Sequence, residues 1–286
     1  MNPPQKLSAF AVPVFLMGLF LFPIIAAADG ESPSATDPVV ESVPVINEPA
    51  IGSGFIKESP ADQKSILSAV PEENIIPGGS CSVAILGSPG DPDWNDDVKD
   101  KIIGTGIFEG SDVTIINIAD VTPTLADLQS FAAVLVYSDA PGYQDSTTLG
   151  DNLADYVDWG GGVVVAVFAN ASLPFNGRFD TDNYWVIKPS GQKSGKEEFL
   201  GTVYVPNHPI LDGVSTFSGG SSSFSMSRVN IEAGAVRIAD WTDERPLVAT
   251  KIINGARRAD LGFYPPSSDA REGFWDTDTD GALLRL

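Results

Sequence analysis

Residues 156–174 read YVDWGGGVVVAVFANASLP, and the rest of the chain is organised around this stretch. Its first four residues end an amphipathic pattern, three glycines at 160–162 stop that pattern, and residues 163–168 form a continuous apolar run. An apolar run of strand length that is rich in β-branched residues is typical of a strand covered on both faces. Such a strand lies in the middle of a parallel sheet, so the stretch predicts an α/β domain built around residues 163–168.

The sequence before this stretch alternates between two periodicities. Strand-like runs cover residues 82–86, 113–118 and 132–137, and helix-like runs cover residues 93–103, 124–131 and 146–159. Strands that alternate with helices at this spacing are joined by right-handed crossovers in a parallel sheet. We therefore expect an α/β fold with a flavodoxin-like parallel sheet flanked by helices.

The regular alternation ends after Pro174. Residues 175–196 form a polar insertion, and β-like runs follow at 199–205, 235–241, 247–253 and 256–264. The dipeptide Asn254-Gly255 separates the last two runs and is the strongest short hairpin signal in the chain. These features predict a β-rich C-terminal portion.

The N-terminal 80 residues differ from the rest in composition. Residues 7–28 carry no charge, follow Lys6 and end in three alanines, which is the layout of a secretory signal peptide at residues 1–28. The same run is long enough for an uncleaved membrane anchor, although we favour cleavage. Residues 29–80 read as a disordered, acidic, Pro/Ser-rich spacer before one domain at residues 81–286. We expect a protein that is secreted or on the cell surface, with a membrane partner only if the signal is uncleaved.

Charge and cysteine content narrow the classes of partner. The formal net charge is −21, from 38 acidic and 17 basic residues. This balance repels a phosphate backbone and argues against nucleic acid, while divalent cations or basic partners fit it better. The single cysteine, Cys81, allows no internal disulfide, so the domain depends on its core for stability.

Several segments together resemble a known superfamily. They are the strand and helix order from Ser82, the glycines 160–162, the segment His208-Pro209-Ile210 to Gly213, and the closing residues 261–264 and 280–284. Over residues 81–286 the chain resembles the class I glutamine amidotransferase-like superfamily, nearest to its trehalose-utilisation-like branch. The resemblance implies a catalytic cysteine directly after the central strand and a histidine late in the chain. Residues 168–172 read FANAS, without cysteine, and His208 is the only histidine, so the glutaminase triad cannot be assembled.

Polar side chains are predicted to gather where the parallel strands end. In open α/β sheets, ligands bind beyond the carboxyl ends of the strands. We expect a ligand-binding rim there, formed by Ser88, Asp91, Asp139, Asn170, Asp180 and Asp182. Residues 170–172 also form an N-glycosylation sequon.

Catalysis by other groups is the alternative reading. Ser172 lies near the strand end, and a serine nucleophile needs a base within hydrogen-bond reach, which here must be His208. No Gly-x-Ser-x-Gly elbow is present. Paired carboxylates could act as acid and base without either residue.

The C-terminal acids suggest a cation site. Asp276, Asp278 and Asp280, followed by Gly281, match the first half of a calcium loop. The acid at position 12 of such a loop would fall at residue 287, so only the first half is matched. Asp280 could equally cap a short helix. Calcium is therefore an open cofactor expectation, and no other cofactor is expected.

Four aromatic residues raise the possibility of a sugar or peptide platform. They are Tyr184, Trp185, Phe274 and Trp275, and core packing explains them equally well. Together these observations predict an exported, non-catalytic binding module for a small molecule, glycan or protein. The alternative is an extracellular hydrolase acting on carbohydrate, ester or amide substrates. Two carboxylates facing each other in a pocket, one with a raised pKa, would favour the hydrolase.

Overall fold

The computed structural model describes residues 82–285. The expected signal segment, the spacer and Cys81 lie outside the described residues. Within residues 82–285, no helix combines the length and the apolar character needed to cross a membrane.

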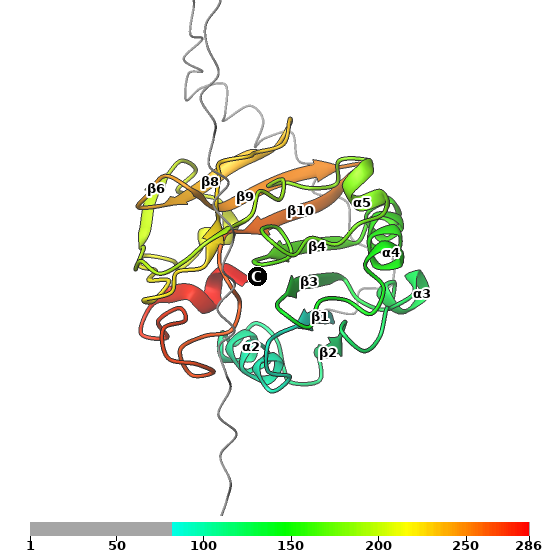
Figure 1. Cartoon of the computed structure of the whole chain (residues 1–286), viewed down its shortest axis with the longest axis horizontal. Coiled ribbons are helices and arrows are strands. Elements are labelled where there is room, and N and C mark those ends of the chain that lie inside the picture. The colour runs from blue at the N-terminus through cyan, green and yellow to red at the C-terminus, as the bar shows by residue number, and fades with distance from the viewer. Residues whose placement is uncertain (1–81, 286) are drawn as a thin grey trace, which may run out of the picture. The chain divides into compact units, whose positions relative to one another are not determined.

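The strands and helices follow the order expected from the sequence (Figure 1). The strands are β1 (Val83–Ser88), β2 (Val113–Asn117), β3 (Ala133–Ser138), β4 (Gly162–Ala166), β5 (Gln192–Lys193), β6 (Leu200–Val203), β7 (Ser225–Met226), β8 (Val236–Trp241), β9 (Pro246–Ile253) and β10 (Ala256–Leu261). The α-helices are α2 (Trp94–Gly104), α3 (Leu125–Leu128), α4 (Ser146–Trp159) and α5 (Arg178–Thr181). The 3₁₀ helices are η1 (Pro209–Leu211) and η2 (Asp280–Arg285).

Eight strands form one mixed sheet in the order β2-β1-β3-β4-β10-β9-β8-β6. Five neighbouring strands are mutually parallel, namely β2, β1, β3, β4 and β10. The sheet continues beyond β10 with β9, β8 and β6, which pair in antiparallel fashion. The order β2-β1-β3-β4-β10 is that of a flavodoxin-like sheet, with β10 as its fifth strand. This topology confirms the expected fold class, including the β-rich C-terminal portion.

The central strand is β4, as the glycine-flanked apolar run predicts. It pairs in parallel with β3 on one side and β10 on the other. Helix α4 ends at Trp159, and Gly160 follows it with φ +112° in the left-handed region, which favours glycine as a helix stop. The helix stop therefore sets where β4 begins.

The Asn-Gly dipeptide forms the expected hairpin turn between β9 and β10. Asn254 has φ +51° and Gly255 has φ +89°, and Ile253 pairs with Ala256 across the turn. Positive φ at both turn residues is the requirement of a type I′ turn. The turn lets β10 run beside β4 in parallel while β9 starts the antiparallel half.

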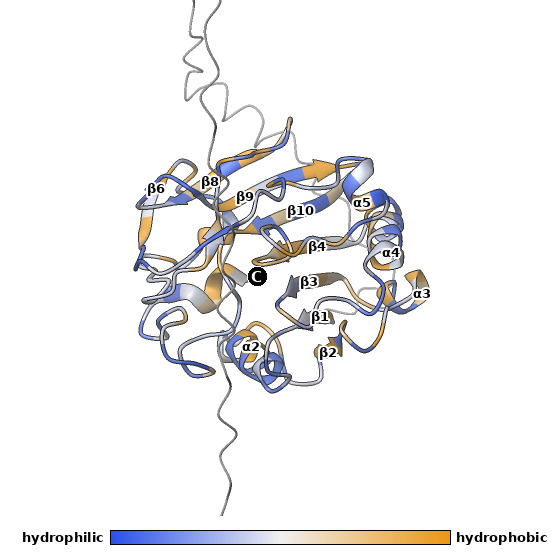
Figure 2. Cartoon of the chain, in the orientation of Figure 1, coloured by the Kyte–Doolittle hydropathy of each residue, from blue (hydrophilic) through white to orange (hydrophobic). Residues whose placement is uncertain are grey.

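Two apolar layers cover the two faces of the sheet. One packs α4 residues such as Leu153 and Val157 against β1, β3 and β4, and the other packs α2 residues such as Val98 and Ile102 against the opposite face. Figure 1 shows α4 and α2 on opposite sides of the parallel strands, and Figure 2 shows apolar residues along β3 and β4. Burial on both faces explains the continuous apolar runs of these strands.

The interpretation of residues 175–196 as a polar insertion is wrong for its first half. The aromatic residues of this half are buried and pack on one another, and they are Phe175, Phe179, Tyr184 and Trp185. Their polar neighbours point to solvent, so the average composition of the segment hides an apolar layer. The segment is part of the core and contacts α4.

A buried ion pair on β10 holds the same segment in place. Arg258 donates to Asp260 at 2.9 Å, and both side chains are fully buried. Asp260 accepts the backbone N–H groups of Val186 at 3.1 Å and Ile187 at 2.7 Å, while Arg258 Nε donates to the Tyr184 carbonyl at 3.1 Å. Burial raises the pKa of Asp260 and lowers that of Arg258, and each group supplies the other with a counter-charge.

Candidate functional site

The loops after β1 and β3 meet at the carboxyl edge of the parallel sheet, as expected. Ser88 is fully buried, and its hydroxyl donates to the Gly142 carbonyl in the loop after β3. Asp139 is partly exposed and accepts the Ala140 N–H at 2.7 Å and the Tyr264 hydroxyl at 3.0 Å. Asp91 is exposed and accepts the Asp93 N–H at 3.1 Å in its own turn. Ser88 and Asp139 therefore tie separate segments together at the rim, while Asp91 bonds within its own turn.

Aromatic side chains fill the space beneath this rim. Trp94 and Tyr264 each pack edge-on against Phe274, with ring centroids 5.1 and 5.3 Å apart. Phe168 lies 5.1 Å from Tyr264 and 4.9 Å from Phe224. Burial, with the charge of Asp139 adding to it, raises the pKa of Tyr264, so its phenol stays protonated and keeps donating to Asp139. The position where α/β sheets usually hold ligands is therefore occupied by the protein itself.

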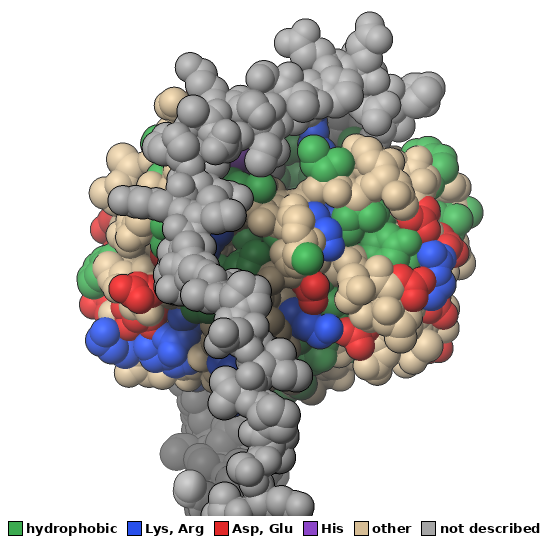
Figure 3. Space-filling view, turned by 90° about the horizontal axis from the view of Figure 1, so that it is seen from above, with side chains coloured by type: hydrophobic (Ala, Val, Ile, Leu, Met, Phe, Trp, Pro, Cys, Tyr) green, Lys and Arg blue, Asp and Glu red, His purple; other side chains and the backbone are tan. Residues whose placement is uncertain are grey.

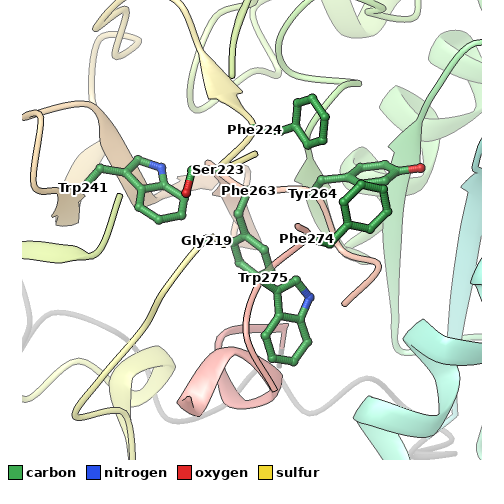
Figure 4. Close-up of a pocket in the computed structure, with 8 residues that line it drawn as sticks. All are labelled: Gly219, Ser223, Phe224, Trp241, Phe263, Tyr264, Phe274 and Trp275. Atoms are coloured by element: carbon green, nitrogen blue, oxygen red, sulfur yellow. The ribbon is translucent and has the colours of Figure 1, made fainter. Parts of the chain in front are cut away.

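A cavity beside this aromatic cluster is too small for an organic ligand. It measures about 10 Å³ and is lined by Gly219, Ser223, Phe224, Trp241, Phe263, Tyr264, Phe274 and Trp275 (Figure 4). A volume of roughly 10–15 Å³ holds a single water molecule. The cavity is a packing defect between aromatic rings.

Asn170, at the elbow after β4, is a core residue. Its Nδ2 donates to the carbonyls of Val165 at 3.1 Å and Leu261 at 2.9 Å, which ties the elbow to β10. Its Oδ1 is buried and has no hydrogen-bond partner among the described residues. Because both amide hydrogens point inward and the side chain is fully buried, the sequon is inaccessible in the folded domain.

The structure does not pair Ser172 with His208. Ser172 donates to Gln192 Oε1 at 2.6 Å. His208 caps η1, because its Nδ1 accepts the Ile210 N–H at 3.2 Å, and burial lowers its pKa. Each side chain has a local structural partner, and no hydrogen bond between the two is present in the part of the chain that is described.

The placement of Asp180 and Asp182 on the strand-end rim is wrong. Arg178 begins the short helix α5, which contains Asp180 and is followed by Asp182. Arg178 forms ion pairs with Asp182 and with Asp158, which lies near the end of α4. Asp158 also accepts from Asn254, which precedes the amino end of β10. Asp182 therefore lies toward the opposite end of the parallel strands. Asp180 accepts the Trp185 indole N–H at 2.9 Å and serves the packing of the same segment.

The C-terminal acids do not converge in this structure. Asp280 Oδ2 accepts four hydrogen bonds from the backbone and hydroxyl groups of Ser215 and Thr216. Asp276 accepts the Asp278 N–H at 3.0 Å, and Asp278 is exposed. Among residues 82–285, no group of three acidic, histidine or cysteine side chains has the geometry of a metal site. Calcium binding at this loop is left without support and stays a prediction.

The expected aromatic platform does not form. Tyr184 and Trp185 pack with Phe179 on the α4 side of the sheet, whereas Phe274 and Trp275 belong to the layer on the opposite face. All four are at most 6% exposed. Core packing, the second of the two readings of these residues, explains them.

An open hollow on the antiparallel half of the sheet was missed by the sequence analysis. It has a volume of about 320 Å³. Its lining comes from β6, β8, the β8–β9 turn and the segment after β7, and comprises Thr202, Tyr204, Ser227, Arg228, Val229, Arg237, Asp243, Glu244 and Arg245. We call it the arginine hollow. Three arginines of residues 228–245 meet Thr202 and Tyr204 here, and no motif in the sequence signals this meeting.

One buried and one partly buried carboxylate orient two of these arginines. Arg237 donates through Nε to Asp240, whose side chain is 1% exposed, and its guanidinium lies 5.4 Å from the centre of the Tyr204 ring. Tyr204 donates to the same Asp240 at 2.7 Å. Arg245 pairs with Asp243, which also accepts from Lys193 at 2.5 Å. Arg237 and Arg245 are thus held in fixed directions.

The carboxyl groups with raised pKa values do not form a facing pair. Burial raises the pKa of Asp240, with the Glu244 charge adding to it, and burial also raises the pKa of Asp260. Asp240 is bonded to Tyr204 and Arg237, and Asp260 is bonded to Arg258. Their direct partners are cations, hydroxyl and amide groups, which differs from an acid–base carboxyl pair.

Comparison with known proteins yields similar structures only. No family model matches the sequence, and no curated protein matches it. A putative ThuA-like protein from Parabacteroides merdae is 15% identical with a TM-score of 0.49, covering 72% of this chain and 88% of that chain. A putative ThuA-like protein from Bacteroides uniformis is 11% identical with a TM-score of 0.49, covering 71% and 87%. The β-galactosidase from Rahnella sp. R3 is 14% identical with a TM-score of 0.42, covering 72% of this chain and 30% of the enzyme.

Likeness at these identities concerns the path of the chain and assigns no activity. The class defined here is an α/β protein with a flavodoxin-like sheet extended by an antiparallel half.

Proposed function

We propose that this chain is an exported, non-catalytic binding module. The observation that carries the proposal is the filled crevice: Trp94, Phe168, Tyr264 and Phe274 occupy the carboxyl edge of the parallel sheet, where α/β enzymes place their substrates. Around it, Ser88 and Asp139 are engaged in bonds between loops. Export is proposed from the signal-like residues 1–28.

The missing cysteine supports the same proposal. In the superfamily that the chain resembles, the nucleophile follows the central strand, and here that position reads Ala169-Asn170-Ala171. All three residues are buried, and Asn170 ties β4 to β10. Because the residues at this elbow pack in the core, we expect the domain to bind a ligand without converting it chemically.

The proposed binding surface is the arginine hollow. Its volume of about 320 Å³ is at the lower end of the roughly 300–1,000 Å³ of small-molecule sites. Its lining mixes charged, hydroxyl and aromatic groups, which suits a polar ligand such as a glycan. Asp240 lies beneath it in bonds to Tyr204 and Arg237, so the acids near the hollow position other side chains.

A turnover assay separates this proposal from the hydrolase alternative. The full chain and a Ser172→Ala, His208→Ala double variant are incubated with chromogenic esters, amides and glycosides and with a panel of polysaccharides. We expect no product above the buffer control for either protein, together with binding to at least one member of the panel. Product formation by the wild-type chain that the double variant or an Asp240→Asn variant abolishes would establish an enzyme and overturn the proposal.

A further inference from the structure

In the arginine hollow, only some of the guanidinium N–H donors form hydrogen bonds within the protein. Resting on the proposed function, we propose that it binds the carboxylate groups of an acidic polysaccharide, a glycan built of uronic acid residues. The ligand carboxylates would contact Arg228, Arg237 and Arg245, and the sugar ring would lie against Tyr204.

Arg228 provides the clearest reason to expect an anion. Its side chain is exposed and makes no ion pair or hydrogen bond within residues 82–285. Arg237 uses Nε for Asp240 and Nη2 for the Glu244 carbonyl, while Arg245 uses Nε for the Ser227 carbonyl and Nη1 for Asp243. A guanidinium carries five N–H donors, so each of these two arginines keeps donors beyond its described bonds. A planar guanidinium suits a carboxylate because the two groups form parallel hydrogen bonds.

The acids in the lining select the kind of anion. Asp243 and Glu244 belong to the same hollow as the three arginines. They would repel a ligand with a dense negative charge, such as a chain of phosphodiesters, because like charges at close range destabilise binding. They are also good acceptors for hydroxyl groups. A sugar with one carboxylate and several hydroxyls per ring suits both, because its carboxylate can contact the arginines and its hydroxyls can donate to the acids.

The remaining lining groups suit a sugar ring. Tyr204 is 43% exposed and Val229 is 52% exposed, so both offer apolar surface to the C–H face of a ring. Thr202 and Ser227 add hydroxyl groups. On the face shown in Figure 3, basic and acidic side chains lie side by side. The net charge of −21 opposes a densely charged polyanion, as do the acids in the lining, so a ligand with widely spaced carboxylates suits the hollow better.

Calorimetric titration of the full chain with uronate oligomers tests the inference. The probes are tetramers of galacturonate, glucuronate and mannuronate, the same tetramers with methyl-esterified carboxyl groups, and polyglutamate of similar charge. We expect at least one uronate tetramer to bind, with affinity that falls as salt is raised. Its methyl ester is expected to bind at least about tenfold more weakly, because charge-assisted hydrogen bonds to the arginines are lost.

Two arginine variants give a matched comparison. Arg228→Gln is expected to weaken uronate binding about tenfold without changing the unfolding midpoint, because the side chain is exposed and supports no described contact. Arg257→Gln removes the same charge from an exposed position on β10 outside the hollow, and it is expected to change the affinity by less than about twofold.

Four results would overturn the inference, and they are distinguishable from failure of the proposed function. They are the absence of uronate binding, equal binding of the methyl esters, equal binding of polyglutamate, and an affinity that Arg228→Gln leaves unchanged. Binding of another member of the polysaccharide panel would then leave the proposed function standing. Shortening of the tetramers by the wild-type chain would overturn the proposed function itself.

Discussion

The carboxylate of Asp280 supplies the hydrogen-bond acceptor for two backbone N–H groups in a loop that has no regular secondary structure. Its Oδ2 accepts the N–H groups of Ser215 and Thr216, both at 2.8 Å, and also both hydroxyls. These backbone hydrogen bonds hold the pKa of Asp280 below its ordinary value. The folded state therefore favours the charged form, so the stabilisation is present above the ordinary pKa and is lost as pH falls through the folded value.

We expect Asp280→Ala to lower the free energy of unfolding by about 1–3 kcal/mol at neutral pH, because two backbone donors lose their acceptor. The same measurement is made with excess calcium and with chelator, which tests the predicted calcium loop. Thermal and urea unfolding measure it, and Asp278→Ala is the control, since Asp278 is exposed and should change stability by less than about 0.5 kcal/mol. A wild-type midpoint that rises with calcium, and a rise that the variants lose, would instead support the calcium loop.

His208 links the stability of η1 to pH. Burial lowers its pKa, and Nδ1 must be unprotonated to accept the Ile210 N–H. The unfolded chain therefore binds a proton more readily than the folded one near the ordinary histidine pKa of about 6.5. The stabilisation is complete above that value and declines as the pH falls below it.

We expect His208→Asn to keep the cap and remove this pH dependence, because asparagine is a good capping residue that does not titrate. The measurement is the difference in unfolding midpoint between wild type and variant at pH 7.5 and at pH 5.5. The variant should gain on the wild type as the pH falls. A difference that stays constant with pH would contradict the role assigned to His208.

At the scale of elements, β10 joins the two halves of the sheet and anchors a distant segment. It pairs in parallel with β4 and antiparallel with β9. Its ion pair, Arg258–Asp260, is fully buried and binds the backbone of residues 184–187. A buried pair of this kind adds little by itself, but losing one partner leaves an uncompensated charge.

We expect Asp260→Ala to lower the free energy of unfolding by about 3–5 kcal/mol, because Arg258 loses its counter-charge inside the core. The amides of Val186 and Ile187 should lose protection from hydrogen exchange beyond the global loss of stability, since Asp260 accepts both. Arg257→Ala, on the exposed side of the same strand, should change stability by less than about 0.5 kcal/mol. Unchanged protection at these two amides would contradict the anchoring role.

At the scale of the described domain, the two halves of the sheet have different characters. The parallel half has an aromatic cluster where a ligand would sit, with Trp94 from α2 and Tyr264 and Phe274 from the segment after β10. The antiparallel half carries the arginine hollow. The binding role that we propose therefore centres on β6 and β8, which belong to the antiparallel half and not to the five-stranded parallel part of the sheet.

Much of the fold could be predicted from the sequence, and less of the site. Helix α4 was expected at residues 146–159 and has those bounds, because its acidic N-cap and glycine stop are local signals. Ser88 and Asp139 were correctly expected near strand ends. Asp182 was wrongly predicted to lie at the strand-end rim. Its position depends on Arg178, which pairs with both Asp182 and Asp158 of α4, and sequence spacing does not reveal these contacts.

The sequence by itself determined the central strand, the helix that precedes it and the β9–β10 hairpin, because an apolar run, a left-handed glycine and an Asn-Gly turn act within a few residues. Tertiary structure decided which polar residues meet. Asp260 reaches its amide partners across 73 and 74 positions, and the arginine hollow brings Thr202 and Tyr204 beside the arginines of residues 228–245. Such contacts form only after the strands have taken their order in the sheet, because that order decides which distant segments lie side by side.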